Sequence, residues 1–143
     1  GFRVTGVDIS ETMISLAQKN VPQASYRCLS ATDIDYDTEF DGIVASYSLL
    51  CLNPAQFKRT AVKIVKALKQ GGLLFIALNE PSAGYKKGKE IVTIMGQKLY
   101  SRPYTEVEIR KMFHMKVLKV GKETIKSKEY GEEHSLIMVM QKL

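Results

Sequence analysis

The beginning of the chain places a buried strand directly before a helix. Residues 2–8 form an apolar run that ends on the carboxylate of Asp8, and Ser10 stands where a helix near 11–19 needs its N-cap. In nucleotide-binding α/β folds, a carboxylate at the carboxyl end of a parallel strand holds ribose hydroxyls. We therefore expect a parallel α/β sheet with a nucleoside-like ligand near Asp8.

Strand and helix signals go on alternating after this opening. Asn53-Pro54 combines a capping side chain with a first-turn proline, which predicts a helix that we expect to end at Gly71-Gly72. Further strands are expected at residues 24–29, 41–46 and 73–78. This repeating pattern predicts an α/β fold with a doubly wound, mostly parallel sheet.

The last part of the chain has a different pattern. Residues 79–89 have the composition of a loop, and Thr105 with Glu108 forms a capping-box signature for a short helix reaching about His114. We expect an antiparallel strand pair at 116–127 and 135–142, joined by a polar connection at 128–134. No repeat or second domain is visible, so residues 1–143 are expected to form a single domain.

The composition is that of a globular protein. Of the 143 residues 45% are hydrophobic and 25% are charged, and no apolar run approaches the ~20 residues of a membrane span. With no leader visible, we expect a cytoplasmic protein that does not enter a membrane. Cys28 and Cys51 lie in apolar stretches without CxxC spacing, which predicts two buried free thiols. The oligomeric state is unknown at this stage.

The positive charge is concentrated in one part of the chain. Residues 86–143 hold 13 basic and 7 acidic side chains, which accounts for the whole net charge of +6. Such a surface could attract RNA or an acidic metabolite. Solvation of an exposed hairpin and loop by lysines is the simpler interpretation, because no basic cluster is interleaved with stacking aromatic residues.

Three ordered stretches carry a family resemblance. They are Val7-Asp8-Ile9-Ser10 followed by Met13 and Ala17, the strand at 40–46, and the turn at 64–74 that contains Gly71-Gly72, with Gln70 in place of a usual proline. Together with the C-terminal antiparallel pair they resemble class I S-adenosylmethionine-dependent methyltransferases, of the type 11/25-like domain. The resemblance implies a Rossmann-like fold, S-adenosylmethionine as cofactor and methyl transfer as the reaction.

The resemblance also assigns residues to the cofactor. Asp8 would hold both ribose hydroxyls, and Ile9 and Met13 would line the adenine. Ser46 ends the strand where the family brings the reactive methyl group beside the substrate.

The adenine contact after the strand at 24–29 departs from the family pattern. Ser30 stands where the family has an aspartate that accepts from the adenine amino group, and the N–H of Ala31 would donate to the ring. Asp33 is an alternative acceptor.

The resemblance further implies a segment that does not appear before Gly1. In the family the first strand lies in the middle of the sheet, and the GxGxG loop behind it holds the methionine end of the cofactor. We expect roughly 30 or more residues to precede Gly1, enough for one strand, one helix and short connections.

The substrate is expected to be a small molecule with a nucleophilic O, N, S or C atom. Asn79-Glu80-Pro81 lacks the motif of enzymes that methylate amino groups of nucleic acids. Candidate substrate residues, weighed against ordinary packing of tyrosines with a surface arginine, are Tyr47, Tyr100, Arg102 and Tyr104. No catalytic residue is assigned, since many such enzymes need only a weak base. Neither histidine has metal-ligand spacing, so no metal is expected.

Two other classes of function stay open. An NAD(P)-dependent Rossmann oxidoreductase would also use Asp8 on ribose, although the terminal antiparallel pair argues against it. A non-catalytic, methyltransferase-like partner module is the second alternative, and Ser30 in the aspartate position is its best support.

Overall fold

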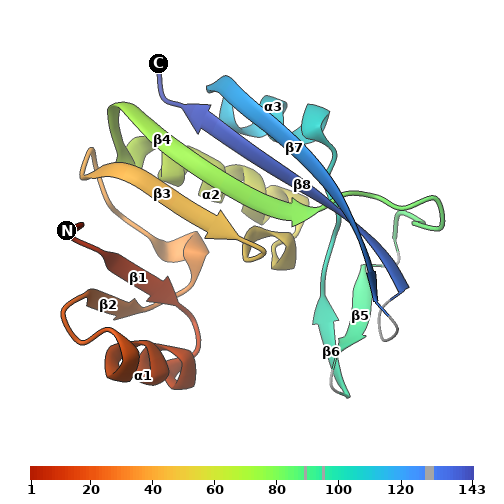
Figure 1. Cartoon of the computed structure of the whole chain (residues 1–143), viewed down its shortest axis with the longest axis horizontal. Helices are drawn as coiled ribbons and strands as arrows, with labels where there is room; N and C mark the ends of the chain where they lie inside the picture. Colours follow the sequence, from red (N-terminus) through yellow and green to blue (C-terminus); the bar gives the residue numbers. More distant parts are fainter. Residues whose placement is uncertain (89, 95, 128–130) are drawn as a thin grey trace. The chain divides into compact units, whose positions relative to one another are not determined.

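The computed structural model describes residues 1–88, 90–94, 96–127 and 131–143 (Figure 1). The chain divides into two compact units, residues 1–35 and residues 36–143, and each is described by itself. The expectation of a single domain stays a prediction.

The first unit is a strand–helix–strand segment. Strand β1 (Thr5–Asp8) pairs in parallel with β2 (Ser25–Cys28), and helix α1 (Glu11–Asn20) connects them. A 3₁₀ turn, η1 (Ala31–Asp33), follows β2. The N-cap prediction is confirmed, because the Ser10 side chain accepts a hydrogen bond from the Met13 N–H.

Tyr26 joins the elements of this unit. Its hydroxyl donates to the carbonyl oxygens of Ala17 and Val21 at the end of α1, at 3.1 and 3.0 Å. Its ring lies so close to Gly6 on β1 that an added Cβ would stand 2.8 Å from a ring carbon. A glycine at position 6 therefore lets the ring pack against the strand.

The second unit is built on a four-stranded mixed sheet. Its order is β3-β4-β8-β7, with β3 and β4 parallel and the other two pairings antiparallel. The strands are β3 (Phe40–Ser46), β4 (Leu68–Asn79), β7 (Lys116–Ser127) and β8 (Gly131–Gln141). The C-terminal antiparallel pair predicted from the sequence is therefore confirmed.

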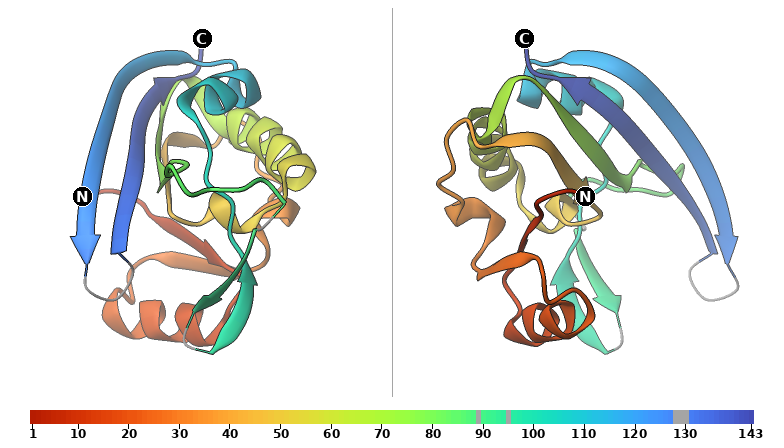
Figure 2. Two further views of the ribbon diagram at one scale, coloured as in Figure 1. Left: turned by 90° about the vertical axis from the view of Figure 1, so that its right-hand side faces the viewer. Right: turned by 60° about the vertical axis from the view of Figure 1, so that its left-hand side comes forward.

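Two helices cover one face of this sheet, as the left-hand view of Figure 2 shows. They are α2 (Pro54–Ala67) and α3 (Glu106–Phe113), and a 3₁₀ turn, η2 (Leu49–Cys51), precedes α2. Asn53 and Thr105 cap the helices, each in a complete capping box. The core between helices and sheet is apolar and contains Phe57, Ala61, Ile64, Leu74, Ile76, Leu78, Ile109, Phe113, Leu136, Met138 and Met140.

The predicted end of the long helix was wrong by a few residues. Helix α2 ends at Ala67, and Leu68 already has extended backbone and pairs with Phe40. The two glycines instead form an irregular turn inside β4. Gly71 has a φ of +75°, and a Cβ on Gly72 would lie 2.8 Å from the Lys69 carbonyl oxygen.

A separate hairpin was not predicted. It consists of β5 (Ile91–Ile94) and β6 (Gln97–Tyr100), which pair antiparallel after the loop that begins at residue 80. Strand β8 also begins earlier than expected, at Gly131, so residues 131–134 are strand rather than connection. The rest of the predicted connection, residues 128–130, lies outside the described residues.

The two cysteines are free, as expected, but they are not buried. Cys28 ends β2 and Cys51 ends η2, and both are exposed in the structure. None of the helices in the described ranges combines the length and the apolar character that crossing a bilayer requires.

Candidate functional site

Asp8 lies exposed at the carboxyl end of β1, as the sequence predicted. Its Oδ1 accepts the Ser10 N–H at 2.8 Å, which fixes the carboxylate beside the start of α1. Among the described residues no hydrogen bond occupies Oδ2. The carboxylate is thus held from one side and open on the other, which fits a group that binds a diol.

Ile9 and Met13 lie next to this carboxylate in the chain and expose large apolar side chains. Ile9 is 74% exposed and Met13 is 54% exposed. The backbone of Ile9 is also fixed, because its carbonyl accepts a hydrogen bond from the Cys28 thiol at 3.5 Å. These residues provide apolar surface of the kind that an adenine ring covers.

Ser30 has a local structural role. Its Oγ accepts the Thr32 N–H at 3.2 Å and lies 2.9 Å from the Thr32 hydroxyl, so it caps η1. No hydrogen bond joins the N–H of the half-buried Ala31 to another described residue. That open donor fits the predicted contact with an adenine ring nitrogen, whereas the contact from Ser30 stays a prediction.

Ser46 and Tyr47 mark the carboxyl end of β3. Ser46 is exposed and pairs with Ala77 on β4. Tyr47 donates its N–H to the Ala77 carbonyl at 2.8 Å, and its hydroxyl donates to Ser135 Oγ at 2.8 Å. Ligands of open α/β sheets bind outside the carboxyl ends of the parallel strands, which is where these two residues lie.

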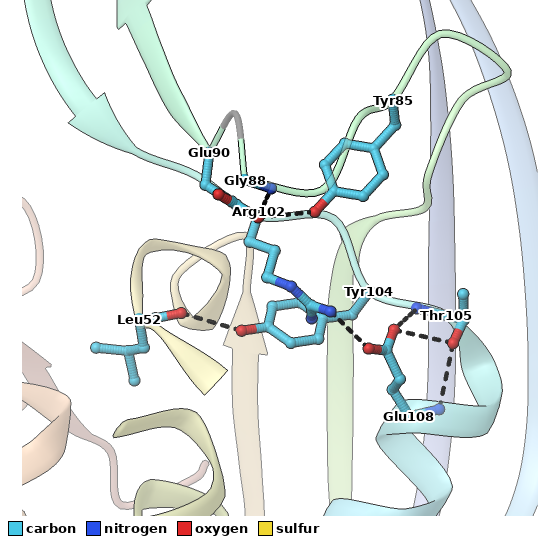
Figure 3. Close-up of polar contacts among 8 residues, drawn as sticks. All are labelled: Leu52, Tyr85, Gly88, Glu90, Arg102, Tyr104, Thr105 and Glu108. Carbon is cyan, nitrogen blue, oxygen red and sulfur yellow. Dashed lines mark hydrogen bonds and ion pairs between the residues drawn. The ribbon is translucent and has the colours of Figure 1, made fainter. Parts of the chain in front are cut away.

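Arg102 and Tyr104 lie inside the second unit (Figure 3). The Arg102 side chain is 9% exposed, ion-pairs with Glu108 at 2.6 Å, and places its Cζ 4.3 Å from the Tyr104 ring centroid. Tyr104 is fully buried and donates its hydroxyl to the Leu52 carbonyl. The sequence-based interpretation of Arg102 as a surface residue was wrong, because its side chain is buried and its charge is paired with Glu108.

Burial and neighbouring charges shift the pKa values of this cluster in opposite directions. Burial raises the pKa of Tyr104 to about 12, although the Arg102 guanidinium opposes the change. Burial also acts to raise the pKa of Glu108, but hydrogen bonds from the Thr105 N–H and from Arg102 lower it overall. Tyr104 therefore stays uncharged and Glu108 stays negatively charged over a wide pH range around neutrality.

Tyr100 is half-buried at the end of β6, close to this cluster. Burial raises the pKa of its phenol, and the charge of Glu90 adds to the effect. Of the four candidate substrate residues, Tyr47 and Tyr100 therefore retain accessible surface, and Arg102 and Tyr104 are internal. A substrate role for any of them stays a prediction.

An open hollow of about 240 Å³ lies at the carboxyl end of β4. Its lining comes from the end of β4 and the loop after it, from the connection between β6 and α3, and from the start of β8, and includes Asn79, Glu80, Tyr85, Ser101 and His134. Sequence reasoning missed this site because its lining comes from segments that are far apart in the chain. Nothing in the local sequence around His134 signals that it lies beside residues 79–85.

Polar contacts order the lining of this hollow. The Tyr85 hydroxyl and the Gly88 N–H both donate to Glu90 Oε1, at 3.1 and 2.8 Å (Figure 3). His134 Nδ1 lies 3.0 Å from the Thr124 hydroxyl, and its Nε2 lies 3.4 Å from Glu132 Oε1. Within the described ranges no group of three or more histidine, cysteine or acidic side chains could hold a metal ion.

Similar solved structures share the fold. An S-adenosylmethionine-dependent methyltransferase of Methanosarcina mazei aligns with a TM-score of 0.86 and 18% identity, over 100% of this chain and 83% of its own. The 1,6-didemethyltoxoflavin-N1-methyltransferase of Burkholderia thailandensis, solved with its acceptor and S-adenosylhomocysteine, aligns with a TM-score of 0.74 and 23% identity. That alignment covers 99% of this chain and 62% of the Burkholderia chain. The expected Rossmann-like methyltransferase fold is thereby confirmed.

The sequence matches point in the same direction. An uncharacterised methyltransferase of Synechocystis is 34% identical over 84 residues, which cover 57% of this chain and 40% of the relative. The chain spans less than half the length of the curated relatives that it matches. A family model for methyltransferase domains matches residues 1–72, about half of the chain. By this match and by the ordered motifs that it contains, the chain belongs to the methyltransferase domain family.

Proposed function

We propose that the protein transfers a methyl group from S-adenosylmethionine to a small-molecule nucleophile, at an O, N, S or C atom. The observation that carries the proposal is Asp8, which lies exposed at the carboxyl end of β1 within the segment that the family model matches. When bound, S-adenosylmethionine supplies a methyl group already activated by its sulfonium. The residues of the chain then need chiefly to orient the reactants and exclude water.

The adenosine part of the donor is assigned to the first unit. Asp8 accepts hydrogen bonds from the ribose hydroxyls, with Oδ2 available and Oδ1 steadied by the Ser10 N–H. Ile9 and Met13 contact the adenine, and the Ala31 N–H donates to it. Ser30 contributes by capping η1, which shapes the backbone that presents Ala31.

The reacting end is assigned to the carboxyl ends of β3 and β4. Ser46 stands where the methyl group is presented, and the hollow beside Asn79 and Tyr85 holds the acceptor. Glu80, Glu132 and Glu133 line the hollow, but Lys122 ion-pairs with Glu80 and Lys126 with Glu132, so these carboxylates do not by themselves select the charge of the acceptor. A small acceptor is supported by the Burkholderia structure, which holds 1,6-didemethyltoxoflavin.

Calorimetric titration of the full-length protein tests the donor assignment. We expect S-adenosylhomocysteine to bind and NADH not to bind. Asp8→Ala should weaken the affinity for S-adenosylhomocysteine at least about tenfold, because a charge-assisted pair of hydrogen bonds to the ribose is lost. Glu11→Gln is the matched control, since Glu11 is an exposed acid three residues further on, in the first turn of α1.

The opposite outcomes separate the alternatives. Binding of NADH in place of S-adenosylhomocysteine would identify an oxidoreductase. Binding of neither would favour the non-catalytic, methyltransferase-like partner module.

A further inference from the structure

His134 belongs to the part of strand β8 that has no partner on β4. Strand β4 pairs with β8 only as far as Ser135, and Figure 1 shows β7 and β8 continuing together past that point. His134 pairs with Thr124 on β7, and its side chain shares a face of the sheet with Leu136, because side chains two residues apart point the same way. Leu136 is buried in the core below the helices. The imidazole therefore lies on the helix side of the sheet, where His134 lines the hollow.

The imidazole is held on one side and open on the other. Nδ1 lies 3.0 Å from the Thr124 hydroxyl, and the His134 carbonyl accepts the Glu80 N–H at 2.7 Å, which fixes the backbone. Among the described residues no hydrogen bond is made by Nε2. The side chain is 32% exposed, so a proton on this nitrogen can pass to water. One ring nitrogen is thus oriented by the protein, and the other is free for a ligand in the hollow.

A carboxylate lies beside the open nitrogen. Glu132 Oε1 is 3.4 Å from Nε2, so it would attract the ring once that nitrogen carried a proton. Its Oε2 lies 3.3 Å from Lys126 Nζ, which weakens its pull on a proton while the ring is neutral. Thr124, His134 and Glu132 therefore have the arrangement of a general base, with an orienting group on one nitrogen and a counterion beside the other.

We propose that His134 Nε2 takes the proton of the acceptor's nucleophile, and that Thr124 positions the ring by accepting a hydrogen bond from Nδ1–H. The proposal rests on the proposed function, which places the acceptor in this hollow. The O–H or N–H bond of the nucleophile breaks, and its electron pair forms the new bond to the methyl group. The electron pair of the broken carbon–sulfur bond stays on sulfur. The proton moves to Nε2 and from there to water.

This role narrows the class of acceptor. A base serves a nucleophile that carries a proton, such as an alcohol, a phenol or an amine, whereas a thioether or a tertiary amine has no such proton to give. Tyr85, Val92 and Pro103 add apolar surface to the same hollow. The class is therefore a hydroxyl or N–H compound with an apolar or aromatic framework. All the residues involved belong to the second unit.

Phenol and anisole test the assignment in the full-length protein, because anisole carries a methyl ether in place of the hydroxyl. Long-range proton–nitrogen NMR spectra distinguish a bare ring nitrogen from one that carries a proton, and His134→Phe assigns the signals. At about pH 8, where imidazole is neutral, we expect the proton on Nδ1 and a bare Nε2. Phenol should shift the Nε2 signal and bind at least about threefold more tightly than anisole, since only phenol donates a hydrogen bond.

The variants separate the ring from its orientation. His134→Phe keeps a flat ring without nitrogens and should bind the two probes equally, within about twofold. Thr124→Val removes the hydroxyl that accepts from Nδ1, so the proton should move to Nε2 and the preference for phenol should disappear although His134 is present. Thr124→Ser keeps the hydroxyl and should keep the preference. His114→Asn is the matched control, because His114 is an exposed histidine at the end of α3, and it should leave the preference unchanged.

A ligand-free wild-type protein whose Nε2 carries the proton would overturn the proposal. Equal affinities for phenol and anisole, or no binding of either, would also overturn it. If His134→Phe does not fold, Thr124→Val and Thr124→Ser decide, and the same preference for phenol in both would count against the proposal. A wild-type protein that does not bind S-adenosylhomocysteine would instead contradict the proposed function, which separates the two failures.

Discussion

The guanidinium of Arg102 donates to Glu108 Oε1 at 2.6 Å, and the other oxygen of that carboxylate accepts the Thr105 N–H at 2.9 Å. One carboxylate therefore neutralises a buried arginine and caps helix α3. Because the arginine follows β6 and the glutamate belongs to α3, this contact ties the base of the β5–β6 hairpin to the helix. It lies within the second unit.

Replacing Glu108 by glutamine should destabilise the second unit by about 1–3 kcal/mol, because Arg102 would then keep a buried charge without a counterion. Glutamine retains an oxygen that can cap the helix, so the loss reports chiefly on the ion pair. Equilibrium unfolding in urea measures it. The control is Glu106→Gln, which breaks a more exposed pair with Arg110 and should cost less than about 0.5 kcal/mol. Equal losses in the two variants would contradict this assignment.

The same carboxylate should contribute to acid sensitivity. The pKa of Glu108 in the folded protein lies below its ordinary value of 4.5. Its stabilising contribution is therefore fully present above pH 4.5 and is lost as the pH falls through the lower, folded pKa. Urea unfolding between pH 7 and pH 3 should show that the stability gap between wild type and Glu108→Gln narrows below about pH 4.5. A gap that stays constant over this range would contradict the prediction.

Tyr104 should lower the stability of the protein at alkaline pH. Its pKa is raised from 10.0 to about 12 by burial, so the unfolded chain loses this proton first as the pH rises. The contribution to stability is complete below pH 10.0 and is lost as the pH rises to about 12.

The variant Tyr104→Phe isolates that contribution. At pH 8 it should be less stable than wild type by about 1 kcal/mol, because the hydrogen bond to the Leu52 carbonyl is lost. Since phenylalanine cannot ionise, the stability advantage of wild type over Tyr104→Phe should fall between pH 10.0 and about 12. Unfolding in urea at several pH values checks this, and the other tyrosines cancel because both proteins contain them. An advantage of wild type that grows over this pH range would be the contrary result.

Local signals in the sequence were enough for the helix starts and for the position of Asp8. Ser10, Asn53 and Thr105 cap their helices as predicted, because capping depends on hydrogen bonds within three residues of the cap. The strand that places Asp8 was also predicted from neighbouring residues, but the predicted start at residue 2 and the predicted burial were wrong, because β1 spans only Thr5–Asp8 and none of its residues is buried. Asp8 therefore lies at the carboxyl end of a strand, as the sequence predicted.

Contacts between distant segments could not be predicted in this way. The β5–β6 hairpin lacks a clear alternation of apolar and polar residues, and it follows a loop rich in lysine and glycine. The burial of Arg102 depends on the chain reversing between that hairpin and α3, which brings Glu108 to it. The contact of Tyr47 with Ser135 joins residues 88 positions apart in the chain. No local pattern encodes a pair at that separation.

Gly72 should tolerate no side chain. An added Cβ would lie 2.8 Å from the Lys69 carbonyl and 3.3 Å from the Phe40 carbonyl, so the backbone of β4 or β3 must move. We expect Gly72→Ala to cost about 1–3 kcal/mol, the usual range for overpacking. Gly84→Ala is the control, because no atom lies within 4 Å of its added Cβ. Thermal unfolding followed by circular dichroism compares them, and a Gly72→Ala transition at the wild-type temperature would contradict the contact.

Both cysteines should react with a thiol reagent in the native protein, since the structure exposes them. Burial raises the pKa of the Cys51 thiol, so at pH 8 its thiolate fraction is smaller than that of an unperturbed cysteine and its labelling should be slower. Colour release from Ellman's reagent measures both thiols, and Cys28→Ser leaves Cys51 alone for comparison with a free cysteine peptide. If Cys51 in this variant reacted only after denaturation, its exposed position at the end of η2 would be wrong. If it reacted as fast as the peptide, the raised pKa would be wrong, because thiolate supply sets the rate at this pH.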